Sequence, residues 1–129
     1  MRKALRQHFG FEDFRPGQEA VIRRVLDGED LCVVMPTGAG KSLCYQLPML
    51  MRPGDGLVVS PLISLMKDQV DALQRRGVAA AFVNSSLPRQ QQSRILHETA
   101  AGGIRILYVA PERFRAGGFR RMLAERPPT

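Results

Sequence analysis

The hydrophobic pattern of the chain alternates short apolar runs with segments of helical period, and Gly or Pro stands at almost every boundary. Continuous apolar runs bounded by turn residues are typical of buried strands. Strands are therefore predicted at residues 31–35, 57–60, 79–83 and 104–110. The first of these runs leads directly into a glycine-containing loop at residues 36–40.

Helices are predicted where apolar residues recur every three or four positions and a Gly follows the last of them. Residues 16–27 have Pro16 at a favoured first-turn position and end at Gly28. Residues 62–76 have the clearest pattern, because their apolar side chains fall on one face: Leu62, Leu65, Met66, Val70 and Leu73. The other predicted helices are residues 2–9, 41–51, 88–101 and 119–125.

Strands that alternate with helices predict right-handed β-α-β crossovers and an α/β fold whose parallel sheet is covered on both faces. The chain has 129 residues, enough for one domain, and its 44% hydrophobic and 24% charged content is typical of a globular protein. No apolar run approaches the ~18 residues of a membrane span, and the basic start lacks the apolar core of an export signal. We therefore expect a cytoplasmic location, in a bacterial-type cytosol or nucleoid. Cys32 and Cys44 are expected to be packed, reduced thiols.

Basic residues are concentrated in the second half of the chain. The net charge is +7; residues 1–64 hold eight basic and seven acidic side chains, whereas residues 65–129 hold eleven and five. A basic region favours nucleic acid as a partner, because binding releases counterions from the phosphates. The same arginines are also compatible with a solvated surface, so charge alone leaves both interpretations open.

The strongest chemical signal is the loop between the first predicted strand and the next helix, Pro36-Thr37-Gly38-Ala39-Gly40-Lys41-Ser42. Glycines let backbone N–H groups curl around phosphate oxygens at a helix N-terminus. Lys41 is suited to neutralise β- and γ-phosphate charge, and Ser42 to bind Mg²⁺. The loop therefore predicts a nucleotide site, with a glycine turn that merely caps the helix as the alternative.

Met35 departs from the strict loop pattern G-x-x-x-x-G-K-[ST], because it occupies the position of the first glycine. This departure weighs against small-molecule and nucleotide kinases. The loop resembles that of superfamily 2 helicases and translocases, which tolerate variation at the first position.

A second group of candidate residues lies upstream of the loop, in the stretch Phe9-Gly10-Phe11-Glu12-Asp13-Phe14-Arg15-Pro16-Gly17-Gln18. An aromatic face and an Arg plane can sandwich a base, and a Gln amide can both donate to and accept from the adenine edge. The alternative is a helix–loop–helix whose aromatics seal the core and whose Gln18 is an ordinary first-turn residue.

The pattern L-x-x-x-F-G-x-x-x-F-R-x-x-Q, here Leu5 to Gln18, resembles motif 0 of the RecQ family of DNA helicases, where it reads the adenine of ATP. Three further stretches resemble motifs I, Ia and Ib of that family in the same order: Val33 to Gln46, Ser60 to Val70 and Leu107 to Phe114. Four motifs in order, over most of the chain, are far more specific than the phosphate loop alone.

The resemblance implies a RecA-like P-loop NTPase fold with three layers, incomplete at its C-terminus. It also implies ATP-driven 3′-to-5′ unwinding of DNA in recombination and repair, with ATP and Mg²⁺ as cofactors. By the same resemblance Phe11 and Arg15 flank the adenine and Gln18 reads its edge. The phosphates and Mg²⁺ are held by Thr37, Gly38, Ala39, Gly40, Lys41 and Ser42.

Contacts to the backbone of single-stranded or partly duplex DNA are implied at four positions: Ser60, Pro61, Lys67 and Arg113. Their placement agrees with the general position of ligands beyond the carboxyl ends of parallel strands. Each has a structural alternative: Pro61 starts a helix, Lys67 pairs with Asp71 at i+4, or Arg113 is a surface cap.

Hydrolysis also needs carboxylates that hold Mg²⁺ and orient water. The only acid just past a predicted strand is Glu112, and the resemblance places the family's Asp-Glu-Ala-His box and second motor lobe after Thr129. We therefore expect residues 1–28 to form adenine-recognition helices and 29–129 a partial ATP-binding domain, with no turnover by the isolated chain. A non-catalytic nucleotide- or DNA-binding module and a small P-loop kinase are the alternatives.

Overall fold

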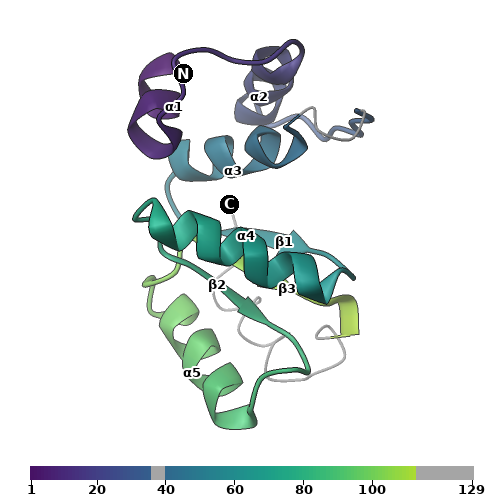
Figure 1. Ribbon diagram of the computed structural model, residues 1–129, viewed down its shortest axis with the longest axis vertical. Coiled ribbons are helices and arrows are strands. Elements are labelled where there is room, and N and C mark those ends of the chain that lie inside the picture. The colour runs from purple at the N-terminus through teal and green to yellow at the C-terminus, as the bar shows by residue number, and fades with distance from the viewer. Residues whose placement is uncertain (36–39, 113–129) are drawn as a thin grey trace. The chain divides into compact units, whose positions relative to one another are not determined.

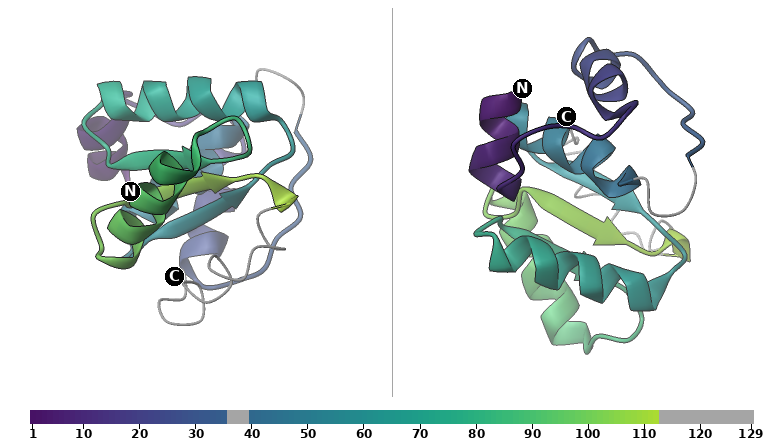
Figure 2. Two further views of the ribbon diagram at one scale, coloured as in Figure 1. Left: turned by 90° about the horizontal axis from the view of Figure 1, so that it is seen from below. Right: turned by 45° about the horizontal axis from the view of Figure 1, so that its top comes forward.

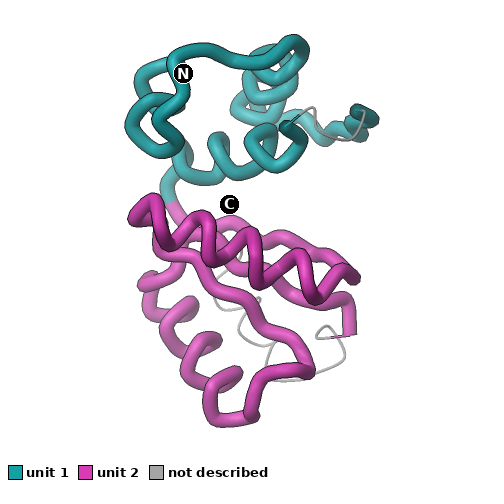
Figure 3. The backbone as a smooth tube through the Cα atoms, viewed as in Figure 1, with its two compact units in different colours: residues 1–53 teal, residues 54–129 magenta. Residues whose placement is uncertain are grey.

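The computed structural model describes residues 1–35 and 40–112, and the chain divides into two compact units, Met1–Pro53 and Gly54–Thr129 (Figure 3). In the described part of unit 1 the elements are α1 (Arg2–Phe9), α2 (Gln18–Leu26) and α3 (Lys41–Met51), labelled in Figure 1. Unit 2 follows with β1 (Gly56–Val59), α4 (Ile63–Arg75), β2 (Ala80–Val83), α5 (Arg89–Ala100) and β3 (Ile106–Val109). The predicted helix at 119–125 lies outside the described residues.

Unit 1 is built on α3, against which both α1 and α2 pack. Each helix contributes an apolar side chain that is completely buried: Leu5 from α1, Ile22 from α2 and Leu47 from α3. The bounds of α1 and α3 are those predicted from the sequence. At the end of α1, Gly10 adopts φ 72°, the left-handed conformation that a glycine allows at a helix C-terminus.

Helix α2 begins two residues later than predicted, at Gln18 rather than Pro16. The reason is Gly17, which has φ 85° and therefore cannot belong to a right-handed helix. Pro16 consequently lies in the turn that precedes α2. The shift makes Gln18 the first residue of the helix.

The strand predicted at residues 31–35 is wrong, because this segment has no regular secondary structure. Val34 is 92% exposed, and Cys32, expected to be packed, is exposed as well. An apolar, β-branched run favours a strand only where a neighbouring strand and a packed surface receive it. Cys44 is buried as expected, and its burial raises the pKa of the thiol.

Unit 2 contains a parallel sheet with the strand order β1-β3-β2 among the described residues. The three strands are in register at both ends, since Gly56 and Ala80 both pair with Ile106, and Val59 and Val83 both pair with Val109. Their carboxyl ends therefore lie side by side along one edge of the sheet. The three predicted strands of this unit and the parallel sheet are confirmed.

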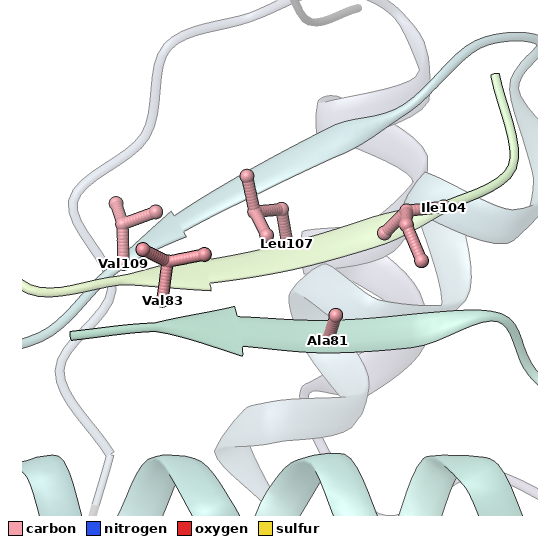
Figure 4. Packing of buried hydrophobic residues seen from close by; sticks show 5 residues of the cluster. All are labelled: Ala81, Val83, Ile104, Leu107 and Val109. Carbon is pink, nitrogen blue, oxygen red and sulfur yellow. The ribbon is translucent and has the colours of Figure 1, made fainter. Parts of the chain in front are cut away.

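Helices α4 and α5 cover opposite faces of this sheet (Figure 2). Side chains on one face form a cluster that packs against Ile95 and Leu96 of α5, and Figure 4 labels its members Ala81, Val83, Ile104, Leu107 and Val109. Tyr108, between Leu107 and Val109, instead donates a hydrogen bond to Gln69 of α4 at 2.7 Å. Because successive side chains of a strand point to opposite faces, the sheet is covered on both sides, as predicted.

The face that α4 buries is narrower than its sequence pattern predicted. Met66, Val70 and Leu73 are buried, but Leu62 is 58% exposed and Leu65 is 43% exposed. Three buried apolar residues over about two turns of α4 pack against one face of this short sheet. Among residues 1–35 and 40–112, no helix is long and apolar enough to cross a membrane.

Candidate functional site

A cavity of about 300 Å³ opens in unit 1 next to the start of α2 and the start of α3. Its lining comes from the end of α1, the loop before α2 and the first turns of α2 and α3. The lining residues are Phe9, Phe11, Asp13, Arg15, Gln18, Gly40, Ser42, Leu43 and Gln46. The structure thus brings together five residues that the sequence analysis assigned to a nucleotide: Phe11, Arg15, Gln18, Gly40 and Ser42.

Gln18 connects the two ends of this cavity through its side-chain amide. Its Oε1 accepts a hydrogen bond from the backbone N–H of Arg15 at 2.8 Å, and its Nε2 donates to the carbonyl oxygen of Gly40 at 3.0 Å. The side chain is buried, with 2% of the residue exposed. A buried amide held at both ends fixes the loop before α2 against the start of α3.

Gly40 is required at its position by both conformation and space. Its φ is 77°, and a Cβ built on it would lie 2.4 Å from Nε2 of Gln18. It is the N-cap of α3 and supplies no side-chain cap, so the first N–H groups of the helix are left to other partners. Lys41, exposed, and Ser42, half-buried, form the first turn of α3. Thr37, Gly38 and Ala39 lie outside the described residues.

The aromatic residues of this stretch differ in exposure. Phe9 is buried at the end of α1, whereas Phe11 is 49% exposed and borders the cavity. A half-exposed aromatic side chain that borders a cavity is suited to contact a ligand there, while Phe9 serves mainly the core of unit 1. The core role that the sequence analysis gave as the alternative is thus confirmed for Phe9, whereas a contact of Phe11 with a nucleotide stays a prediction.

The DNA-contact candidates that the structure describes belong to unit 2. Ser60 follows β1 at the carboxyl edge of the sheet, where its N–H donates to Val109 at 3.0 Å. Its Oγ accepts a hydrogen bond from the N–H of Leu62 at 3.2 Å, which shapes the turn into α4. Pro61 lies in that turn, and α4 begins two residues later, at Ile63.

Lys67 forms an ion pair within α4, as its structural alternative anticipated. Its Nζ lies 2.8 Å from Oδ2 of Asp71, and both side chains are substantially exposed. The hydrogen bond that Lys67 donates to Asp71, together with the negative charge of Asp71, raises the pKa of Lys67. Arg113 lies outside the described residues.

A family model for DEAD/DEAH box helicases matches residues 15–124 of the chain. The chain belongs to the DEAD/DEAH box helicase family. This membership disfavours the kinase alternative, and it agrees with the resemblance found in the motifs.

Within this helicase family, the chain is similar to bacterial and human RecQ-type proteins. It is 49% identical over 120 residues to the ATP-dependent DNA helicase RecQ of Haemophilus influenzae, covering 93% of this chain and 19% of that protein. Identity is 46% with RecQ of Bacillus subtilis (92% of this chain, 20% of the relative) and 43% with ATP-dependent DNA helicase Q4 of Homo sapiens (98% and 11%). The chain thus spans about a fifth or less of these relatives.

The helicase fold is also found in a solved structure. A hypothetical ATP-dependent RNA helicase from Sulfolobus tokodaii superposes with a TM-score of 0.77 and 23% identity, covering 98% of this chain and 39% of that one. The expected RecA-like P-loop NTPase fold class is confirmed by this likeness.

Two polar residues that line this cavity, Asp13 and Gln46, were given no role by the sequence analysis. Asp13 accepts hydrogen bonds from the N–H of Phe14 at 2.9 Å and from Nε and Nη2 of Arg2 at 3.2 and 3.1 Å. These contacts, the Phe14 N–H first, lower the pKa of Asp13. Gln46 stands one helical turn after Ser42, a spacing that could have predicted it; no local signal pointed to Asp13.

Proposed function

We propose that this chain is the nucleotide-binding part of an ATP-dependent DNA helicase of the RecQ type, which unwinds DNA in the 3′-to-5′ direction in recombination and repair. One observation supports it above the others. The hydrogen bonds of Gln18 join the base-reading loop to the start of α3, beside a cavity of about 300 Å³. A site for a nucleotide needs base recognition and phosphate recognition at such a fixed spacing.

The residues of the cavity fit an adenine. The exposed face of Phe11 and the side chain of Arg15 would flank the ring, and Gln18 would read its edge. An amide offers two N–H donors and two acceptor lone pairs, and the two hydrogen bonds of Gln18 use one of each. Residues 1–28 would then be adenine-recognition helices, and 29–129 a partial ATP-binding domain.

The start of α3 fits the phosphates. Lys41 and the N–H groups of the first turn would hold them, together with Thr37, Gly38, Ala39 and Gly40. Ser42 would bind Mg²⁺, which when bound neutralises phosphate charge. Gly40 lets the Gln18 side chain approach the backbone at the start of α3, since it has no Cβ in the place that Nε2 of Gln18 occupies.

Single-stranded or partly duplex DNA is the proposed partner of unit 2, in the cytoplasm. Its backbone would contact Ser60, Pro61, Lys67 and Arg113. Ser60 and Pro61 stand at the carboxyl edge of a parallel sheet, where ligands of such folds bind. Contacts of this kind position a strand without reading its bases.

Binding of a fluorescent ATP analogue to the chain tests the proposal. We expect Lys41→Ala to weaken binding at least about tenfold, because a charge-assisted contact to phosphate is lost. Lys3→Ala, an exposed lysine of α1, is the matched control and should leave the affinity unchanged.

Competition by GTP separates base reading from simple loss of fold. We expect Gln18→Ala to reduce the preference for ATP over GTP by about tenfold, since hydrogen bonds to a base edge supply discrimination of that size. An equal loss of affinity for both nucleotides would contradict the base-reading role. Unchanged binding in both Lys41→Ala and Gln18→Ala would contradict the nucleotide site itself.

A further inference from the structure

The ion pair on α4 involves the lysine that the proposed function assigns to DNA. Nζ of Lys67 and Oδ2 of Asp71 are 2.8 Å apart, and the side chains are 67% and 41% exposed. Arg75 donates to the backbone carbonyl of Asp71 at 3.2 Å, so it approaches the main chain of that residue. The carboxylate of Asp71 thus contacts Lys67, whereas its backbone carbonyl contacts Arg75.

The direction of this contact matters for a ligand at the sheet edge. Ser60 and Pro61 precede α4, whereas Asp71 lies one helical turn beyond Lys67 toward the C-terminus of the helix. The ion pair draws the ammonium group along α4 and away from the turn that holds Ser60. The positive charge of Lys67 therefore lies next to the Asp71 carboxylate.

We propose that Asp71 is an internal competitor for the DNA phosphate that Lys67 binds, and so limits the affinity of this contact. The inference rests on the proposed function of Lys67. A phosphate near Lys67 must draw the ammonium group away from Asp71 or share it, and the carboxylate also repels the phosphate. An exposed ion pair is weak enough for such an exchange, because solvent screens it. A contact of limited strength suits a protein that releases one phosphate before binding the next.

Asp68 provides a matched control for Asp71. It is exposed on the same helix, one residue after Lys67, and it has the same charge. Its charge also raises the pKa of Lys67, less strongly than that of Asp71. Asp68→Asn and Asp71→Asn therefore change the net charge equally, but Asp71→Asn also removes the hydrogen-bonded partner.

The experiment measures binding of a labelled single-stranded oligonucleotide by fluorescence anisotropy. At about 50 mM salt we expect Asp71→Asn to bind about threefold more tightly than Asp68→Asn, and at about 300 mM salt the difference should shrink because charges are screened. Adding Lys67→Gln to each variant should abolish the threefold difference, because the ammonium group for which Asp71 and the phosphate compete is then absent.

The possible results distinguish a failure of the competitor role of Asp71 from a failure of the proposed DNA binding. Equal affinities for Asp68→Asn and Asp71→Asn would overturn the competitor role and leave DNA binding by the chain in place. A threefold difference that survives Lys67→Gln would also overturn it, because Asp71 would then act without Lys67. If no variant binds the oligonucleotide, the proposed DNA contacts fail, and the inference fails with them.

Discussion

The two units hold their candidate contact residues in different ways. In unit 1 the link between the two halves of the cavity is a buried amide, Gln18, with a hydrogen bond at each end. In unit 2 the candidates Pro61 and Lys67 are exposed and Ser60 is half-buried, and Lys67 forms a solvent-accessible ion pair with Asp71. Buried hydrogen bonds fix geometry and respond little to salt, whereas exposed charges adjust and respond strongly to it. A site that must keep base and phosphate contacts at a fixed spacing needs buried hydrogen bonds. A site that binds a strand transiently is better served by exposed charges.

The largest expected effect comes from placing a side chain at Gly40. In Gly40→Ala the Cβ would lie 2.4 Å from Nε2 of Gln18, at a φ of 77° that L residues rarely adopt. We expect a loss of about 2–4 kcal/mol in the free energy of unfolding, from backbone strain and a broken buried hydrogen bond together. Nucleotide affinity should fall more than about tenfold, because the link across the cavity is lost. Urea denaturation and binding of a fluorescent ATP analogue measure the two effects.

Gly28→Ala is the control for backbone strain in the same unit. Gly28 has φ 84°, but a Cβ there would meet nothing within 4 Å. We expect it to cost about 1 kcal/mol, the strain alone, and to leave nucleotide binding unchanged. If the two variants lost equal stability and affinity, the buried link would not be what holds the cavity.

A smaller effect is expected from the partly buried hydrogen bond between Tyr108 and Gln69 in unit 2. Tyr108→Phe removes the hydroxyl that donates to Gln69 at 2.7 Å, and so loosens α4 from β3. We expect a loss of about 1 kcal/mol in the free energy of unfolding, the usual contribution of one such bond, with nucleotide affinity unchanged. Denaturation of Tyr108→Phe, of Gln69→Leu and of the double variant gives the coupling energy. A coupling energy near zero would show that this hydrogen bond does not stabilise unit 2.

The secondary structure could be predicted wherever its signals are local. Gly40 and Gly10 mark the adjoining ends of α3 and α1, and both helices have the predicted bounds. The strands of unit 2 were predictable because apolar runs and helices alternate there. Residues 31–35 have the same apolar character yet form no strand, because a strand also depends on a neighbour that the local sequence does not specify.

The candidate site could be predicted as a set of residues but not as a geometry. Motif spacing pointed to Gln18 and Gly40 separately, 22 residues apart, and the hydrogen bond between them depends on how α2 packs against α3. Asp13 was missed because its partners are a backbone N–H and Arg2, on another element. Local patterns report which side chains are suited to a ligand, while packing decides which of them meet.

The smallest expected effect concerns Asp13 of unit 1, whose exposed carboxylate forms an ion pair with Arg2. Contacts from the Phe14 N–H and Arg2 lower its pKa from the ordinary 3.8, so they stabilise the folded state above that pH and are lost as the pH falls through the lowered pKa. Asp13→Asn should therefore unfold at a slightly lower urea concentration than the parent chain at about pH 7, and the difference should vanish as the pH falls below the lowered pKa. The effect stays small because Arg2 keeps a second acidic neighbour when Asp13 is replaced: its Nη2 lies 3.9 Å from Oε2 of Glu19. Added salt should reduce the effect further, because it screens exposed charges. A difference that persists in acid and in high salt would show that Asp13 acts through packing and not through its charge.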